Sequence, residues 1–205
     1  DVDLDFDQAF TTAVADNPDL PIDEGHYPEL VGSLDWHGVN YYGPISIVGL
    51  PASSIGGLPS IDVADYDPSL PHSSLGFAID APGFGEILDA FAVYGLPLYI
   101  TENGLGDPTD ADRAMYLVEH LDQLQSAIGR GVDVRGYYHW SLMDNFEWHE
   151  GFHPRFGLFR VDRENGFTRT ETEGAATVRE IAGSRRVTAA QLEELGGVGP
   201  MTPEE

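Results

Sequence analysis

Short strand-like segments alternate with helical patterns along this chain, and that order restricts the possible folds more than any other feature of the sequence. Segments 34–42, 96–101 and 134–140 have the alternation or the β-branched and aromatic content of strands. Apolar residues at helical spacing lie between them, at 84–94 and 110–130. Strands that alternate with helices of this length predict an α/β fold with a parallel sheet.

Weaker signals extend this order at both ends of the chain. A further strand is predicted at 157–162 and a further helix at 173–182, whereas residues 1–30 are expected to hold at most one short helix. Residues 43–83 are rich in Gly, Pro and Ser and are predicted to form a long loop. We therefore expect one domain over residues 1–183, followed by a polar, loosely held tail at 184–205.

The longest predicted helix also has recognisable ends. Asp110 is expected to cap its start, because an aspartate oxygen can accept hydrogen bonds from the first free backbone N–H groups. Gly129 and Gly131 are expected to end it, since glycine tolerates the left-handed conformation in which helices commonly stop.

Charge and composition exclude several classes of partner. The 205 residues include 35 acidic and 10 basic side chains, all of the latter arginine, for a net charge of -25. Such a chain repels phosphate backbones and anionic lipid surfaces, so neither nucleic acid nor a membrane is an expected partner. No apolar run approaches the roughly 20 residues that span a bilayer, which makes a cytoplasmic location the default. The acid excess favours adaptation to high salt over a simple preference for arginine codons.

The carboxylate directly after segment 96–101 is the strongest candidate for chemistry. Glu102 would lie at the C-terminal end of a parallel strand, which is where α/β barrels place their reactive groups. Tyr42 and Asn40 lie at the end of an earlier strand, and Trp140 at the end of a later one. A hydroxyl from Tyr42 could orient the carboxylate, and the indole of Trp140 could form the floor under a sugar ring.

Each of these residues also has a purely structural explanation. A glutamate after a strand is commonly a helix cap or a surface charge, Trp140 could belong to the core, and Glu147 could be a solvated loop carboxylate. His149, Glu150 and His153 have the spacing of a zinc site on a helix, but Gly151 and Pro154 argue against a helix there. Taken singly, none of these residues identifies a function.

Their joint order and spacing are more specific. The segments Asp35–Tyr42, Leu98–Gly104, Val134–Trp148 and Arg155–Leu158 resemble those of the retaining β-glycosidases of glycoside hydrolase family 1, most closely its archaeal branch. The resemblance covers residues from about 30 to 182. It implies that the chain is the C-terminal portion, about strands six to eight, of a (β/α)8 TIM barrel.

The resemblance also implies a role for each candidate residue. Glu102 would be the nucleophile, Tyr42 would orient it, and Asn40 would contact the 2-hydroxyl of the sugar. The remaining residues would form the sugar site: Trp140 as platform, Glu147 as acceptor of hydrogen bonds from distal hydroxyls, Trp148 in support of it, and Phe156 as a wall. The family needs no metal or other cofactor. Glu147 and the lack of lysine favour unphosphorylated β-D-glucosides or β-D-galactosides as substrates.

The family's general acid/base motif is not found in these 205 residues, which are too few for this family's complete barrel. Because the chain opens with Asp1 rather than methionine, a leader or an upstream half could precede it. Three explanations remain open: the other half of the barrel is a separate or missing polypeptide, the chain self-associates, or it is a non-catalytic sugar-binding or structural remnant.

Overall fold

The structure, a computed structural model, describes residues 32–44, 47–49, 62–63 and 71–196. The chain divides into two units, one made of residues 1–33 and 45–66 and the other of residues 34–44 and 67–205. In the first unit, β2 (Ile47–Gly49) pairs antiparallel with β3 (Asp62–Val63). The helix expected within residues 1–30 lies outside the described residues, as does about half of the loop expected at 43–83. The described part of that segment is not all loop, because it contains β2, β3 and the first residues of a helix that begins at Ala81.

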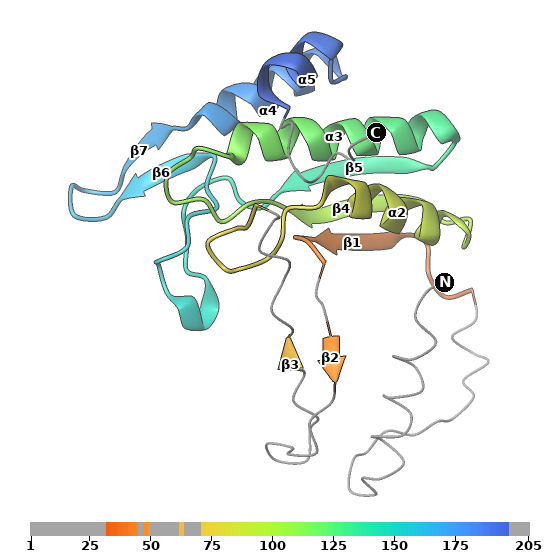
Figure 1. Cartoon of the computed structure of the whole chain (residues 1–205), viewed down its shortest axis with the longest axis horizontal. Helices are drawn as coiled ribbons and strands as arrows, with labels where there is room; N and C mark the ends of the chain where they lie inside the picture. Colours follow the sequence, from red (N-terminus) through yellow and green to blue (C-terminus); the bar gives the residue numbers. More distant parts are fainter. Residues whose placement is uncertain (1–31, 45–46, 50–61, 64–70, 197–205) are drawn as a thin grey trace, which may run out of the picture. The chain divides into compact units, whose positions relative to one another are not determined.

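A three-stranded parallel sheet forms the centre of the second unit (Figure 1). Its strands lie in the order β1 (His37–Tyr41), β4 (Leu98–Asn103) and β5 (Val134–His139). Helix α2 (Ala81–Ala92) connects the first pair of strands, and α3 (Arg113–Arg130) connects the second. The three predicted strands and the two helices between them are confirmed. Because the strands are parallel, their C-terminal ends lie at the same edge of the sheet.

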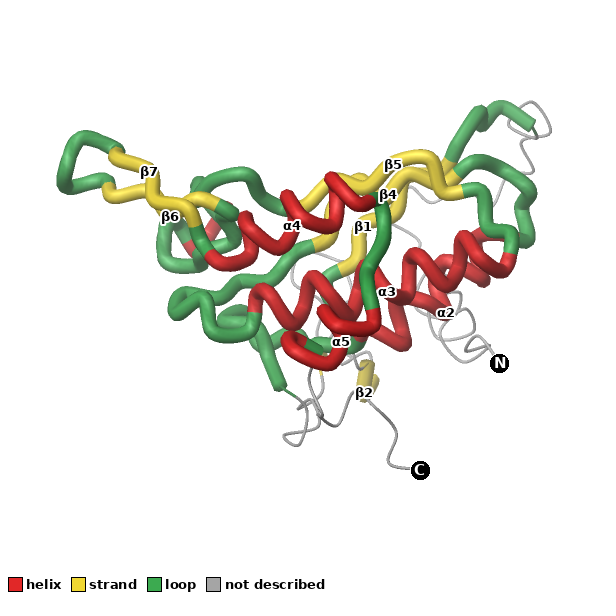
Figure 2. The backbone as a smooth tube through the Cα atoms, turned by 90° about the horizontal axis from the view of Figure 1, so that it is seen from above, coloured by secondary structure: helices red, strands yellow, loops and turns green. Residues whose placement is uncertain are grey.

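One face of this sheet packs against α2 and α3, which lie on the same side of it in Figure 2. The core between the two layers consists of Val39, Tyr41, Leu98 and Ile100 from the strands, Phe84, Leu88 and Ala127 from the helices, and Val132. Two apolar residues of the predicted helical patterns, at 84–94 and 110–130, lie outside this core, since Ile87 is 36% exposed and Ile128 is 47% exposed. The helices therefore bury a narrower stripe than their sequences indicate.

Helix α3 does not begin as predicted. Its N-cap residue is Asp112, whose side chain makes no capping hydrogen bond, and the carboxylate of Asp107 instead accepts from the Asp112 N–H at 2.9 Å. Asp110 has a φ of 64° and forms an ion pair with Arg113, so the prediction that it caps the helix is wrong. Gly131, with a φ of 103°, ends the helix in the left-handed conformation as expected, whereas Gly129 lies inside α3, so the prediction that Gly129 also ends the helix is wrong.

The chain beyond β5 leaves the parallel sheet. After the short 3-10 helix η2 (Trp148–Glu150), the predicted strand appears as β6 (Phe159–Asp162), but it pairs antiparallel with β7 (Thr168–Glu171). The Asp162 carboxylate accepts hydrogen bonds from the backbone of Glu164 and Asn165, which closes the turn of this hairpin. Strand β7 was not predicted from the sequence.

Two helices complete the described chain. The predicted helix is α4 (Glu173–Ser184), and it is followed by α5 (Ala189–Leu195), which starts with a capping box at Thr188. Val187 is buried, and Leu192 and Leu195 pack against a core cluster shared by α3 and α4. The expectation of a loosely held tail missed this packing.

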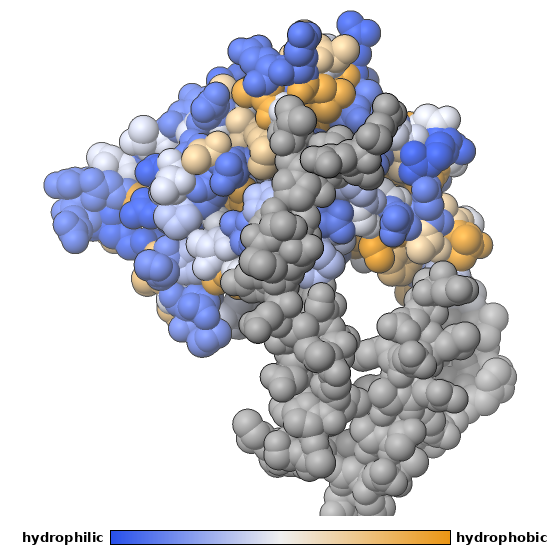
Figure 3. All heavy atoms as spheres, viewed as in Figure 1, coloured by the Kyte–Doolittle hydropathy of each residue, from blue (hydrophilic) through white to orange (hydrophobic). Residues whose placement is uncertain are grey.

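The described chain exposes polar side chains together with several large hydrophobic ones, among them Val93, Tyr94 and Trp148. Figure 3 shows hydrophilic residues over much of the face seen in Figure 1, including the β6–β7 hairpin. Within the described residues, no helix is both long enough and apolar enough to span a membrane.

Candidate active site

Glu102 and Tyr42 meet where β4 and β1 end. The Tyr42 hydroxyl donates a hydrogen bond of 2.6 Å to Oε2 of Glu102. Burial raises the pKa of Tyr42 far above its ordinary value, and the hydrogen bond to Glu102 and the negative charges of Glu102 and Glu147 reinforce the shift. The phenol therefore keeps its proton at any physiological pH and remains a donor to the carboxylate.

Phe156 lies beside this pair. Its ring is 4% exposed and meets the ring of Tyr42 edge to face, with the ring centroids 5.9 Å apart. This contact restricts how far the phenol can rotate away from Glu102, because the aromatic edge occupies the space next to it.

Asn40 is the register partner of Glu102 on the neighbouring strand. Its Oδ1 accepts a hydrogen bond of 2.6 Å from Oγ1 of Thr101, and the residue is otherwise exposed. Since Oδ1 is held by the threonine, the amide nitrogen of Asn40 is oriented as a donor at this edge of the sheet.

Trp140 and Glu147 form a second pair. The indole Nε1 of Trp140 donates to Oε2 of Glu147 at 3.4 Å, and the backbone N–H of Trp140 donates to the carbonyl of Asn103 at 2.9 Å. Trp140 is thus attached to the residue that follows Glu102. Trp148, by contrast, is 80% exposed, so most of its indole is open to solvent.

Together these contacts bring six of the seven predicted residues to one edge of the sheet. The hydroxyl of Tyr42 donates to Glu102, and the negative charge of Glu147 also contributes to the raised pKa of Tyr42. Carboxylate oxygens, an amide donor and a flat indole in one place suit a ligand with several hydroxyl groups and an apolar ring face. Trp148 is the predicted residue that these contacts do not include.

Asn103, which has no role predicted from the sequence, holds the end of β4 in place. This side chain is fully buried, and its Nδ2 donates to the carbonyl of Tyr41 at 2.8 Å and to the hydroxyl of Tyr116 at 2.7 Å. Its Oδ1 accepts from the hydroxyl of Tyr137 at 2.9 Å. The sequence offers one signal for this role, an amide side chain directly after an apolar run. It does not reveal the partners of Asn103, because these come from three other elements, β1, α3 and β5.

Gly104, the next residue, is required by close packing. A Cβ atom at this position would overlap the carbonyl oxygen of Trp140. The end of β4 can therefore approach the Trp140 backbone only with glycine here.

The residues considered as a zinc site do not converge on a metal. Nε2 of His149 lies 2.8 Å from Oε1 of Glu150, and the His149 side chain is 89% exposed. Among the residues that the structure describes, no group of three or more His, Cys, Asp or Glu side chains is arranged to hold a metal ion.

Comparisons with known proteins identify the family of this chain. The model of glycosyl hydrolase family 1 matches residues 5–186. The chain is 40% identical over 187 residues to the β-galactosidase of Sulfolobus acidocaldarius and 39% identical over 184 residues to that of Saccharolobus solfataricus, in each case over 85% of this chain. It spans about a third of the length of these relatives, since the matched regions cover 36% of each.

The solved structures that resemble this chain are also β-glycosidases. The β-glycosidase from Pyrococcus horikoshii is similar with a TM-score of 0.70 and 36% identity over 80% of this chain and 38% of that one. The β-glycosidase from Thermosphaera aggregans is similar with a TM-score of 0.71 and 33% identity over 84% of this chain and 37% of that one. The parallel sheet with its helices thus corresponds to part of a (β/α)8 barrel. The chain belongs to glycosyl hydrolase family 1.

Proposed function

We propose that this chain is the part of a retaining β-glycosidase that carries the nucleophile and the sugar-binding residues. The observation that carries the proposal is the hydrogen bond from Tyr42 to Glu102, made at the strand ends beside the Trp140–Glu147 pair. In this assignment β1, β4 and β5 are strands six, seven and eight of the barrel, and Glu102 lies at the end of the seventh.

The proposed reaction is a double displacement. Because Tyr42 holds Oε2 of Glu102, Oε1 is the oxygen that attacks the anomeric carbon, and the bond from that carbon to the leaving oxygen breaks. The leaving oxygen takes a proton from a general acid outside this chain, and a glycosyl ester of Glu102 remains. Water then attacks the same carbon, gives a proton to that acid/base group and releases Glu102.

The proposed substrates are unphosphorylated β-D-glucosides and β-D-galactosides. The indole face of Trp140 can pack against the apolar side of the sugar ring, while Glu147 accepts hydrogen bonds from vicinal hydroxyls. A phosphate on the sugar would be repelled by Glu147, and the chain contains no lysine to neutralise it.

A partner is part of this proposal. Three parallel strands cannot close a cylinder, and the matched region covers about a third of the relatives, at 36%. A complementary N-terminal barrel half, or a second copy of the chain, would cover the free edges of the sheet and, in the first case, supply the general acid.

The test is a mechanism-based label. A 2-deoxy-2-fluoro-β-glucoside with a dinitrophenyl leaving group needs little protonation to depart, so it should esterify Glu102 without the general acid. Peptide mass spectrometry should place the added sugar on Glu102, and Glu102→Gln should abolish labelling. Glu193→Gln, which changes an exposed glutamate on α5, is the matched control and should leave labelling intact.

The alternative is a sugar-binding chain without turnover. Its signature would be monosaccharide affinity that Glu102→Gln leaves unchanged, together with no labelling of the parent chain even when the N-terminal half is added. Labelling of any other residue would equally contradict the proposed nucleophile.

A further inference from the structure

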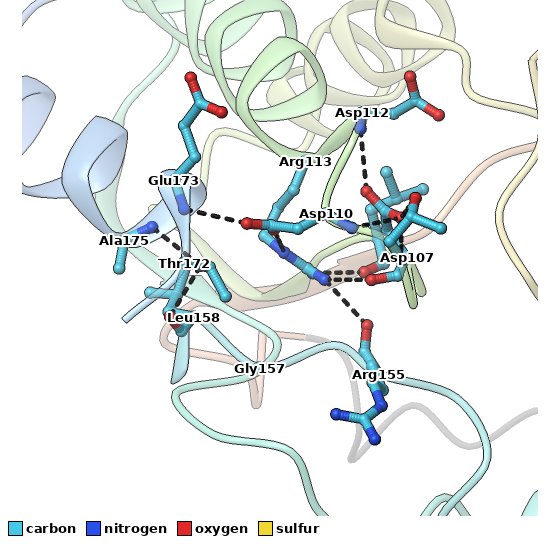
Figure 4. A network of polar contacts seen from close by, with 12 residues as sticks. Asp107, Asp110, Asp112, Arg113, Arg155, Gly157, Leu158, Thr172, Glu173 and Ala175 are labelled. Atoms are coloured by element: carbon cyan, nitrogen blue, oxygen red, sulfur yellow. Dashed lines mark hydrogen bonds and ion pairs between the residues drawn. The ribbon is translucent and has the colours of Figure 1, made fainter. Parts of the chain in front are cut away.

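Arg113 is a buried cation that the proposed reaction does not use. Its side chain is 1% exposed at the start of α3, and among the described residues one carboxylate, that of Asp110, pairs with it, at 2.7 Å. The remaining donors of the guanidinium face backbone oxygens (Figure 4). They bind the carbonyls of Leu105, Asp107, Arg155 and Phe156 at 2.7, 2.8, 3.0 and 3.1 Å.

These carbonyls belong to two segments that are far apart in the sequence. Leu105 and Asp107 follow β4, which carries Glu102, whereas Arg155 and Phe156 precede β6. The backbone N–H of Asp107 also donates to the carbonyl of Arg155 at 2.9 Å, so the two segments are joined directly as well as through the guanidinium.

A third segment is attached at the same point. The carbonyl of Phe156 accepts not only from Arg113 but also from the backbone N–H of Ser141, at 3.1 Å. Ser141 directly follows Trp140, and the ring of Phe156 contacts Tyr42. One guanidinium thus connects the backbones that carry Glu102, Trp140 and Phe156.

The chemistry of arginine suits this task and that of lysine does not. The guanidinium is planar, stays protonated and directs five N–H donors in fixed directions, so it can reach carbonyls on two sides at once. A lysine ammonium concentrates three donors on one atom and cannot span the same acceptors. Asp110, whose other oxygen accepts from the backbone N–H of Glu173 at 3.0 Å, supplies the opposite charge.

We propose that Arg113 is a positioning residue of the site, an inference that rests on the proposed function. It holds the segments after β4, after β5 and before β6 in one arrangement, and thereby keeps Glu102, Trp140 and Phe156 at the distances that a bound sugar requires. It does so through backbone oxygens and touches no substrate itself.

The test compares Arg113→Lys with Arg130→Lys. Both change an arginine on α3, but Arg130 is exposed and pairs with Asp89 on the surface. We expect labelling of Glu102 by the fluoro-sugar to slow at least about tenfold in Arg113→Lys and to change less than twofold in Arg130→Lys, since misplacement by about 1 Å can cost a hundredfold in rate.

Amide hydrogen exchange distinguishes the loss of order in the three segments held by Arg113 from a general destabilisation of the fold. In Arg113→Lys, exchange should rise at least about tenfold in peptides covering 104–108, 139–143 and 154–158 together, and stay unchanged in the second half of α3. An equal rise throughout the sheet, or an unchanged labelling rate in a folded variant, would overturn the proposal.

A milder variant covers the case in which Arg113→Lys does not fold. Asp110→Asn removes the paired charge, keeps an oxygen acceptor and suits the φ of 64°, because asparagine tolerates the left-handed region. It should show the same exchange pattern at smaller amplitude. If the parent chain is never labelled, the proposed nucleophile fails, and the exchange pattern alone then decides whether Arg113 holds the three segments.

Discussion

At the scale of single residues, buried histidines make the fold sensitive to acid. His120 is fully buried on α3, its ring stacks on Tyr116 with the centroids 3.7 Å apart, and its Nδ1 lies 2.8 Å from the Tyr116 carbonyl. Burial lowers the pKa of His120 to about 3, and burial together with the charge of Arg113 lowers the pKa of His139 to about 3. Both rings are therefore neutral in the folded protein, whereas an unfolded histidine binds a proton below about pH 6.5.

This difference predicts how stability changes with pH. Below about pH 6.5 the unfolded chain binds more protons than the folded one, so the free energy of unfolding falls as the pH drops toward the folded pKa values near 3. Each buried histidine contributes a slope of roughly 1.4 kcal/mol per pH unit in this window.

His120→Phe should remove one of these contributions. The phenyl ring keeps the contact with Tyr116 but cannot be protonated. The free energy of unfolding of the variant should therefore fall with decreasing pH with a slope that is smaller than that of the parent by about 1.4 kcal/mol per pH unit. Urea unfolding at several pH values between about 4 and 7 measures the slope. His149→Gln, at an exposed position, is the control and should follow the parent curve. Parallel curves for the parent and His120→Phe would contradict the argument.

At the scale of elements, the ends of β4 and β5 are joined more closely than ordinary strand packing requires. The Trp140 N–H bonds the Asn103 carbonyl at 2.9 Å, and the Trp140 carbonyl occupies the space where a side chain at residue 104 would begin. This backbone contact fixes the position from which the indole of Trp140 donates to Glu147.

Gly104→Ala should break this contact. Its Cβ would overlap the Trp140 carbonyl, so one strand end must shift, and we expect a loss of about 1–3 kcal/mol in unfolding free energy together with slower labelling of Glu102. Chemical denaturation and the labelling rate measure both effects.

Gly129→Ala is the matched control within α3. The new methyl group would have no heavy atom within 4 Å, and alanine favours the helix, so this variant should be more stable than the parent by about 0.5–1 kcal/mol. Equal behaviour of the two variants would show that the close approach at Gly104 is not required.

At the scale of the whole molecule, repulsion between like charges opposes folding. The net charge is -25 over 205 residues, and hydrophilic side chains cover much of the surface seen in Figure 3. Screening shortens the range of this repulsion, since the Debye length falls from about 10 Å at 0.1 M salt to about 3 Å at 1 M.

The thermal midpoint should therefore rise as sodium chloride increases from about 0.1 to 1 M. A rise of several degrees is expected, because about 1 kcal/mol shifts the midpoint of a domain of this size by roughly 2–4 °C. The same titration near pH 4, where many carboxylates are protonated, should show a weaker effect. A midpoint that does not change with salt at neutral pH would contradict adaptation to high salt.

Much of this protein follows from local pattern. The period of the apolar residues was enough to predict β1, β4, β5, α2 and α3, because strand and helix periodicity depends on neighbours a few residues away. Residue type at the strand ends made Glu102 and Tyr42 candidates, and the order and spacing shared with the family selected them; the structure contains the expected hydrogen bond between them.

Other features depend on contacts between distant segments, which local pattern does not encode. Asp110 has the residue type of a cap, but its partners Arg113 and Glu173 determine its actual role. Strand β6 pairs with β7 rather than with the parallel sheet, and Val187 and Leu192 bury part of the expected tail. Arg113 resembles any helical surface arginine until its four carbonyl partners, up to 43 residues away, come together around it. A buried polar group requires partners, and only the folded chain determines which segments provide them.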